Sequence, residues 1–148
     1  MINDRQPASA EMAAVEEVND RFYRALEACE LTAMEALWLH TEWVRCVHPG
    51  WELLVGWNQV RESWARIFQN SRGLRVMPSE VAVLIAGDFA WVSCTENLVI
   101  YYESGAPVSA VTTATNLFQR VSGEWLMVLH HASPVPASMP INESETVQ

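Results

Sequence analysis

The residues best suited to chemistry lie between Trp43 and Phe68, in the stretch WVRCVHPGWELLVGWNQVRESWARIF. This stretch holds the chain's only His-Pro-Gly triplet, at His48, and four of its seven tryptophans: Trp43, Trp51, Trp57 and Trp64. Ligand sites are mostly apolar hollows with a few placed polar groups, so the stretch predicts one rim of a pocket. An imidazole with its ordinary pKa of about 6.5 exchanges protons near neutral pH, which makes His48 the candidate general acid or base. The alternative is a histidine that only caps the turn through a backbone carbonyl.

Three further polar residues lie on predicted strands. His130 and His131 end the last strand, where neighbouring side chains point to opposite faces. One of them therefore faces inward, and we expect it to be His131. Asn116 lies in the apolar-rich segment VTTATNLFQRV, where a buried amide needs partners. It could orient a substrate carbonyl, bond to a neighbouring strand, or lie on a half-buried face.

Metal and thiol chemistry have weaker support in the sequence. His48 and one of the paired histidines could hold a metal with Glu52 or Glu96, but no close metal-ligand spacing is present, so we expect no metal. Cys46 would share a face with His48 on a strand, yet a buried, inert thiol is the more usual case. The three cysteines are widely spaced without a Cys-x-x-Cys pair, which predicts free thiols: Cys29, Cys46 and Cys94.

Composition argues against several classes of function. The formal charge of −9 repels phosphate backbones and anionic lipids, so we expect neither nucleic acid nor a membrane as a partner. All nine basic residues are arginine, which excludes Schiff-base and phosphate-loop lysines, and we expect no cofactor. The start MINDRQPASAEM lacks a signal-peptide pattern, and no apolar run is long enough to span a bilayer, so the expected location is cytoplasmic.

Helical spacing dominates the first half of the chain. Apolar residues recur every three or four positions from about Ala10 to Cys29, which predicts an amphipathic helix. The capping-box pattern of 32–35 opens a second, short helix, and a third follows from about Asn58. Between them, alternation over 43–47 predicts a short strand that Pro49-Gly50 ends, so His48 is at a strand end.

The second half has the alternation of strands. Turn signals separate four segments, at about 74–86, 89–102, 108–121 and 124–132, and short connections make such strands antiparallel neighbours. Helices followed by a meander indicate a single α+β domain over residues 10–133, with the helices on one face of a strongly curved antiparallel sheet. Residues 1–9 and 134–148 are expected to be flexible ends.

This order of elements, with VRCVHPGW, GWNQVRESWARIF and EWLMVLHHASP, resembles the SnoaL-like branch of the nuclear transport factor 2 superfamily over about Ala13 to Pro134. The resemblance implies a cystatin-like cone whose sheet wraps an apolar cavity, and a homodimer formed through the sheet. It does not choose a function, because the superfamily contains isomerases, dehydratases, epoxide hydrolases, polyketide cyclases and non-catalytic binding modules.

Ketosteroid isomerases of that superfamily carry an Asp-Pro-x-Gly segment whose aspartate is the general base, and His48-Pro49-Gly50 is similar to it. Their oxyanion-hole tyrosine matches Phe22 and their protonated aspartate roughly matches Thr115, so both strong donors are replaced. Combined with the candidates above, the expected ligand-binding residues are Phe22, Trp51, Trp64, Thr115, Asn116 and His131.

Two functions remain open at this point. The first is a binding site for an apolar or aromatic small molecule, with cofactor-free isomerase, dehydratase or cyclase chemistry at His48. The second is a non-catalytic ligand-binding or oligomerisation module, in which the protein's own side chains fill the cone. Trp64, which recurs at helical spacing, is better explained by core packing than by ligand binding.

Overall fold

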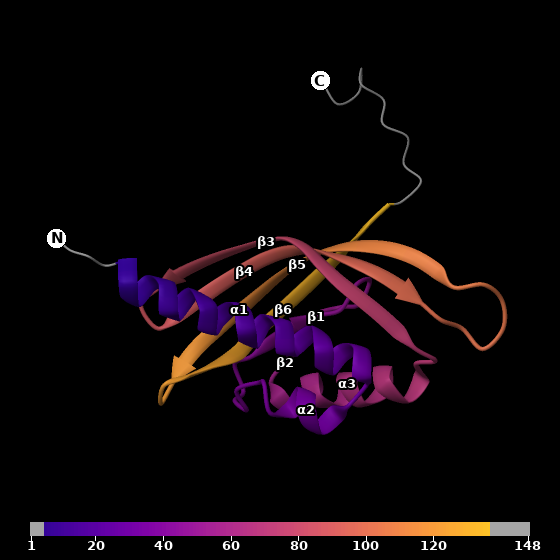
Figure 1. Cartoon of the computed structure of the whole chain (residues 1–148). Coiled ribbons are helices and arrows are strands. Elements are labelled where there is room, and N and C mark those ends of the chain that lie inside the picture. The colour runs from indigo at the N-terminus through magenta and orange to yellow at the C-terminus, as the bar shows by residue number, and fades with distance from the viewer. Residues whose placement is uncertain (1–4, 137–148) are drawn as a thin grey trace, which may run out of the picture.

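The computed structural model describes the backbone of residues 5–136 and the side chains of residues 10–136. Its elements follow in the order α1 (Arg5–Ala28), α2 (Leu31–Glu35), β1 (Arg45–Val47), β2 (Leu54–Val55), α3 (Trp57–Asn70), β3 (Leu74–Ala86), β4 (Phe89–Ile100), β5 (Val108–Val121) and β6 (Glu124–Val135). Figure 1 shows the helices on one side of a curved sheet. The predicted α+β architecture is confirmed.

The six strands form one sheet in the order β2-β1-β6-β5-β4-β3. Strands β3 to β6 are the predicted antiparallel meander. The short β1 lies parallel to β6, with Cys46 opposite His130 and Val47 opposite His131. This pairing joins the strand that ends before His48 to the strand that carries the paired histidines.

A bulge in β6 changes which of its side chains face the helices. Leu117 of β5 pairs with Leu129, but the next residue, Phe118, pairs with Met127, so Val128 is an extra residue in β6. A bulge of this kind shifts the inward and outward series by one position. Met127 and Val128 are both buried, and beyond them His130, rather than His131, faces the core.

Helix α1 crosses the inner face of the sheet and supplies much of the core. It begins at Arg5, earlier than the predicted Ala10, and Pro7 is tolerated because it lies in the first turn. The helix is held near both ends: Arg120 pairs with Glu11, and a Glu27 carboxylate oxygen accepts the Val76 N–H at 2.7 Å.

The ends of the domain differ from the prediction. Strand β6 runs to Val135, so Pro134 is paired with Thr112 and is part of the sheet. The remainder of the predicted flexible ends, residues 1–4 and 137–148, lies outside the described residues. Among the described helices, none is long and apolar enough to cross a membrane.

Candidate functional site

The backbone around His48 turns sharply at the end of β1. The His48 carbonyl accepts the Trp51 N–H at 2.8 Å, and Gly50 adopts a φ of 83°, a conformation that favours glycine. Pro49 and Gly50 are exposed, whereas the His48 side chain is 3% exposed. The predicted strand end is therefore correct, and the turn directs the imidazole into the core.

The His48 ring is held by one hydrogen bond and two aromatic contacts. Its Nε2 lies 2.8 Å from the Ser63 hydroxyl oxygen, and that hydroxyl donates to the Val60 carbonyl at 2.6 Å. Trp51 and Trp64 contact the ring edge to face, at 4.8 and 4.5 Å between centroids. Burial lowers the pKa of His48 to about 3, and His130 contributes to the shift. At neutral pH the imidazole is uncharged, in contrast to the ordinary pKa assumed from the sequence.

A second group of buried polar side chains starts at His130. Its Nδ1 lies 2.7 Å from the Asn116 side-chain oxygen. The Asn116 amide nitrogen donates to the Asn19 side-chain oxygen at 2.8 Å and to the Tyr23 hydroxyl at 3.0 Å. Burial lowers the pKa of His130 to about 3, and His131 adds to the shift. Of the alternatives open for Asn116, the structure shows a buried hub whose polar atoms are bonded within the protein.

The chain of hydrogen bonds continues to a buried carboxyl group. The Tyr23 hydroxyl donates to Glu96 at 2.6 Å, and the Thr112 hydroxyl donates to the other oxygen of Glu96. Burial raises the pKa of Glu96, although the two hydroxyl donors oppose the shift. Burial, followed by the nearby Glu96 and Cys94, raises the pKa of Tyr23, so Tyr23 remains a hydrogen-bond donor. A carboxyl group in a core is costly unless it is hydrogen-bonded, and here two donors satisfy it.

Aromatic rings fill the space between these two groups. Phe22 contacts Trp64 edge to face at 5.7 Å and lies 4.8 Å from the His130 ring. Trp64 lies 5.9 Å from His130, and the His48 and His130 rings are 6.3 Å apart. The centre of the cone that the sequence predicts as a ligand cavity is thus occupied by the protein's own side chains.

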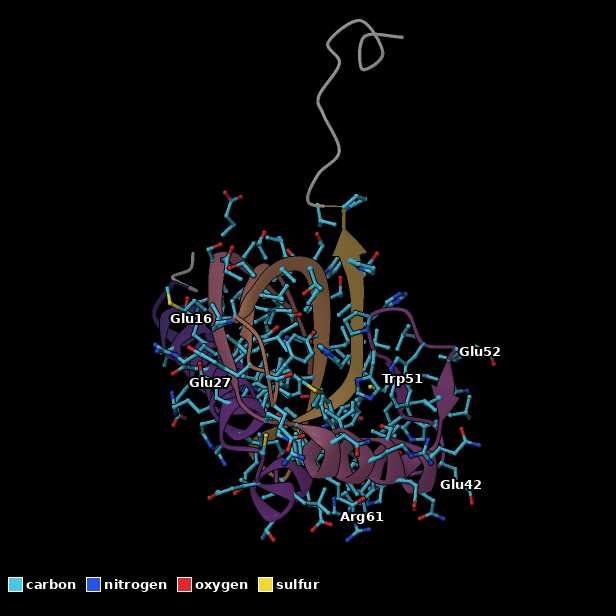
Figure 2. The ribbon with its side chains drawn as sticks, turned by 90° about the vertical axis from the view of Figure 1, so that its right-hand side faces the viewer. Glu16, Glu27, Glu42, Trp51, Glu52 and Arg61 are labelled. Carbon is cyan, nitrogen blue, oxygen red and sulfur yellow. The ribbon has the colours of Figure 1, made fainter. Side chains whose placement is uncertain are left out.

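Hollows on the surface reach both polar groups. A hollow of about 320 Å³ touches Ser63 and Trp51, the residues beside His48; its lining comprises Trp51, Leu54, Asn58, Gln59, Glu62, Ser63 and Arg66. Figure 2 shows Trp51 on the side of the molecule where α3 lies. A second hollow of about 470 Å³, between α1 and β3, is lined in part by Asn19. Each polar group therefore has one member at the wall of a surface hollow.

Metal and thiol chemistry gain no support from the geometry. Within the described residues, no group of three or more histidine, cysteine, aspartate or glutamate side chains is placed to hold a metal ion. Glu52 is exposed, and Glu96 is bonded to Tyr23 and Thr112. The cysteines are free, and burial raises the pKa of Cys46, which keeps it a thiol.

Two of the expected ligand-binding residues lie on the outer face of the sheet, away from the core that they were expected to line. Thr115 pairs with His131 across β5 and β6, and His131 is exposed on the outer face while His130 is buried. The expectation for His131 is wrong because strict alternation was assumed through the bulge at Val128. Phe22, Trp64 and Asn116 are in the core, and Trp51 lies at its edge with 36% exposure.

Five polar residues of the buried group are absent from the expected ligand-binding residues, although the sequence suggests Glu96 as a metal ligand and His130 as the alternative inward histidine: Asn19, Tyr23, Glu96, Thr112 and His130. A usable signal was present for four of them. Asn19 and Tyr23 are four residues apart, on one face of α1. Glu96 and Thr112 share the inward parity of apolar neighbours on their strands. A polar residue in an apolar inward series is a candidate for a buried hydrogen-bonded group.

Comparisons with known proteins place this geometry in a family. The model of the SnoaL-like domain matches residues 15–138. A solved structure from Streptomyces avermitilis, described as a candidate dehydratase of the NTF2-like family, is 34% identical, with 86% of this chain and 98% of that chain covered and a TM-score of 0.81. Other solved structures that match are described as having a cystatin-like fold, which confirms that expectation.

Two further relatives carry different descriptions. A structure from Thiobacillus denitrificans, described as a candidate calcium/calmodulin-dependent protein kinase type II association domain, is 33% identical, with 81% of this chain and 94% of that chain covered and a TM-score of 0.72. The F-box protein SKIP8 of Arabidopsis thaliana is 33% identical over 132 residues, which are 89% of this chain. Only 54% of SKIP8 is covered, so the chain spans about half the length of that relative.

Proposed function

This chain belongs to the SnoaL-like domain family, and we propose that it is a cofactor-free enzyme that transfers a proton on a small apolar or aromatic molecule, with His48 as the general base. Isomerisation, dehydration and cyclisation all belong to this class. The observation that carries the proposal is an uncharged imidazole that contacts Ser63 and Trp51, two residues in the wall of a surface hollow. The description of the Streptomyces relative favours dehydration.

The uncharged state of His48 serves isomerisation, dehydration and cyclisation alike, so within this class it is the description of the Streptomyces relative that favours dehydration. The low pKa of His48 means that the surroundings disfavour the imidazolium ion, so a proton taken from carbon is released again readily. In a dehydration, the C–H bond breaks toward the imidazole, a carbon–carbon double bond forms, and the same proton passes to the departing hydroxyl, which leaves as water. The histidine ends the reaction uncharged, and no redox partner is required.

The first experiment identifies the ligand. Mass spectrometry of protein purified without denaturation is expected to show a co-purifying small molecule, whose chemical class then directs the choice of substrate. On that substrate, His48→Ala is expected to lower kcat/KM by about 10²- to 10⁴-fold, the usual contribution of a general base. His131→Ala, on the outer face, is the matched control and should retain activity. Unchanged turnover in His48→Ala would contradict the proposal.

A non-catalytic binding or assembly module is the second candidate. It is favoured by the aromatic rings that occupy the cone and by the description of the Thiobacillus relative as an association domain. A natively purified protein that carries no small molecule, and that is not stabilised by any apolar or aromatic compound tested, would favour the module over the enzyme.

For either function we propose a homodimer formed through the outer face of the sheet. Four apolar residues are direct cross-strand neighbours there and form an apolar row: Leu84, Trp91, Leu117 and Leu129. Leu84 and Trp91 are 58% and 51% exposed. A contiguous exposed apolar patch is typical of a protein–protein interface.

Trp91→Arg is expected to convert the dimer into a monomer, because a charged side chain at the centre of an apolar interface would be buried without a partner. Sedimentation velocity at micromolar concentration measures the change. Trp43→Arg is the control, since Trp43 is 47% exposed but precedes β1 and lies outside the sheet. A wild-type protein that sediments as a monomer would exclude the proposed dimer.

A further inference from the structure

We infer that Ser63 and Asn116 are positioning residues that hold the two buried histidines in opposite tautomers, His48 protonated on Nε2 and His130 protonated on Nδ1. An uncharged imidazole carries one N–H and one lone pair, and the hydrogen-bond partner decides which nitrogen has which. This inference deepens the proposed function and rests on it in one respect: it names the nitrogen of His48 that would act as the base.

The single hydroxyl hydrogen of Ser63 determines the tautomer of His48. The Val60 carbonyl, 2.6 Å from the hydroxyl, can only accept, so this hydrogen is committed to Val60. Bonding to the carbonyl three residues earlier is usual for a serine within a helix. The Ser63 oxygen, 2.8 Å from Nε2, can then only accept from His48. Nε2 must therefore carry the hydrogen, and Nδ1 carries the lone pair.

Cys46 is the other polar neighbour of the His48 ring, and it does not decide the tautomer. Its sulfur lies 3.7 Å from Nε2 and 3.9 Å from Nδ1. Such similar distances to both nitrogens mean that the sulfur is not in line with either lone pair, and a thiol is a weak donor. The Ser63 contact is shorter and involves a stronger acceptor, so it determines the outcome.

The two amide hydrogens of Asn116 determine the tautomer of His130. Both are used, one on the Asn19 side-chain oxygen and one on the Tyr23 hydroxyl. The Tyr23 oxygen is free to accept because its own hydrogen is donated to Glu96. The Asn116 oxygen therefore faces His130 as an acceptor at 2.7 Å, and His130 must donate through Nδ1. Its lone pair is consequently on Nε2.

In these tautomers the lone pair of each imidazole is on a defined nitrogen: Nδ1 in His48 and Nε2 in His130. Nδ1 is therefore the atom at which the His48 ring can take a proton, while Ser63 remains bonded to Nε2. His130 has the tautomer that is less stable in free histidine: a free neutral histidine favours Nε2–H, and the protein must impose Nδ1–H. The energetic cost of that choice is met by the fully bonded Asn116 hub.

Nuclear magnetic resonance of protein containing ¹⁵N-labelled histidine tests the inference without a substrate. Substituting both exposed histidines, as His40→Gln with His131→Gln, leaves the signals of His48 and His130 alone. Long-range ¹H–¹⁵N spectra at pH 7 distinguish the two neutral tautomers and the charged ring by their nitrogen shifts. We expect one ring as Nε2–H and one as Nδ1–H. Two Nε2–H rings, two Nδ1–H rings, or a charged ring would overturn the inference.

Variants at Ser63 assign the cause and identify the His48 signals. In Ser63→Ala, Nε2 loses its acceptor, so both tautomers become populated and the two nitrogen shifts of His48 should converge. Ser63→Thr retains a hydroxyl and should restore the separation between the two nitrogen shifts of His48. Ser93→Ala, on the outer face of β4, should change nothing. Shifts that are unaffected in Ser63→Ala would refute the role of Ser63. Because no substrate is used, this result is independent of whether His48→Ala impairs turnover.

Discussion

Lowering the pH from 7.5 to 5 is expected to destabilise the folded protein by about 2 kcal/mol for each buried histidine, or about 4 kcal/mol for His48 and His130 together. Burial lowers the pKa of each to about 3 in the folded state, whereas an unfolded histidine titrates near 6.5. The unfolded chain therefore binds more protons in this range, and stability falls as the pH falls below about 6.5. The expected loss of stability at pH 5 depends mainly on the pKa of histidine in the unfolded chain, because both histidines have folded-state pKa values well below 5.

Glu96 acts in the opposite direction. Burial raises the pKa of Glu96 in the folded state. Protonation of Glu96 at low pH therefore stabilises the folded state relative to the unfolded chain, and this stabilisation is lost as the pH rises through the folded-state pKa. Part of the histidine effect is thereby offset in the wild-type protein. Glu96→Gln removes this offset, and that variant is expected to show a steeper acid destabilisation than the wild type.

Denaturant unfolding at pH 7.5, 6 and 5 measures these effects. His48→Gln and His130→Gln should each reduce the pH dependence by about half, while His131→Gln should change it much less, because His131 is exposed on the outer face and acts only through its smaller effect on the pKa of His130. A free energy of unfolding that stays constant from pH 7.5 to 5 in Glu96→Gln would show that the two imidazoles are not buried as the structure places them.

Replacing Asn116 with leucine is expected to lower the free energy of unfolding by about 3 kcal/mol or more at pH 7.5. Leucine has a similar size, so the loss comes from polar groups rather than from a cavity. Three buried partners lose their bonds, namely Asn19, Tyr23 and His130, and each unsatisfied group costs about 1–3 kcal/mol.

The matched control for this variant is Thr113→Ala, on the same strand but exposed, which should change stability by no more than about 0.5 kcal/mol. Denaturant unfolding of both variants beside the wild type gives the difference directly. A loss below about 1 kcal/mol in Asn116→Leu would mean that Asn116 is not the hub of the buried polar group.

Local patterns were sufficient to predict every described element except β2, and to place His48 at the end of a short strand. The three- and four-residue recurrence in α1 follows from the helical period, and the turn at Pro49-Gly50 follows from the conformational demands of those two residues. The meander followed from short connections between alternating segments. Each of these inferences depends on residues that are close together in the sequence, where the backbone period alone sets the geometry.

These local patterns do not predict which polar residues form the buried site. The match of Phe22 to an oxyanion-hole tyrosine missed that the next residue, Tyr23, is also buried and reaches Glu96, 73 residues away. Helix α1 buries a face wide enough to include both aromatic rings, which contact each other at 4.9 Å. How wide a face is buried depends on the curvature of the sheet over it, which periodicity does not report.

The amino-acid sequence was enough to predict an α+β domain with helices before a meander, and it shows an acidic chain without lysine and a histidine at the end of a short predicted strand. Which of the paired histidines lies beside His48 in the core depends on contacts between strands. The parallel pairing of β1 with β6 brings Cys46 opposite His130, and the extra residue Val128 turns His130 inward and His131 outward. Both are pairings between strands distant in sequence, and a single-residue change of register reverses every side chain beyond it.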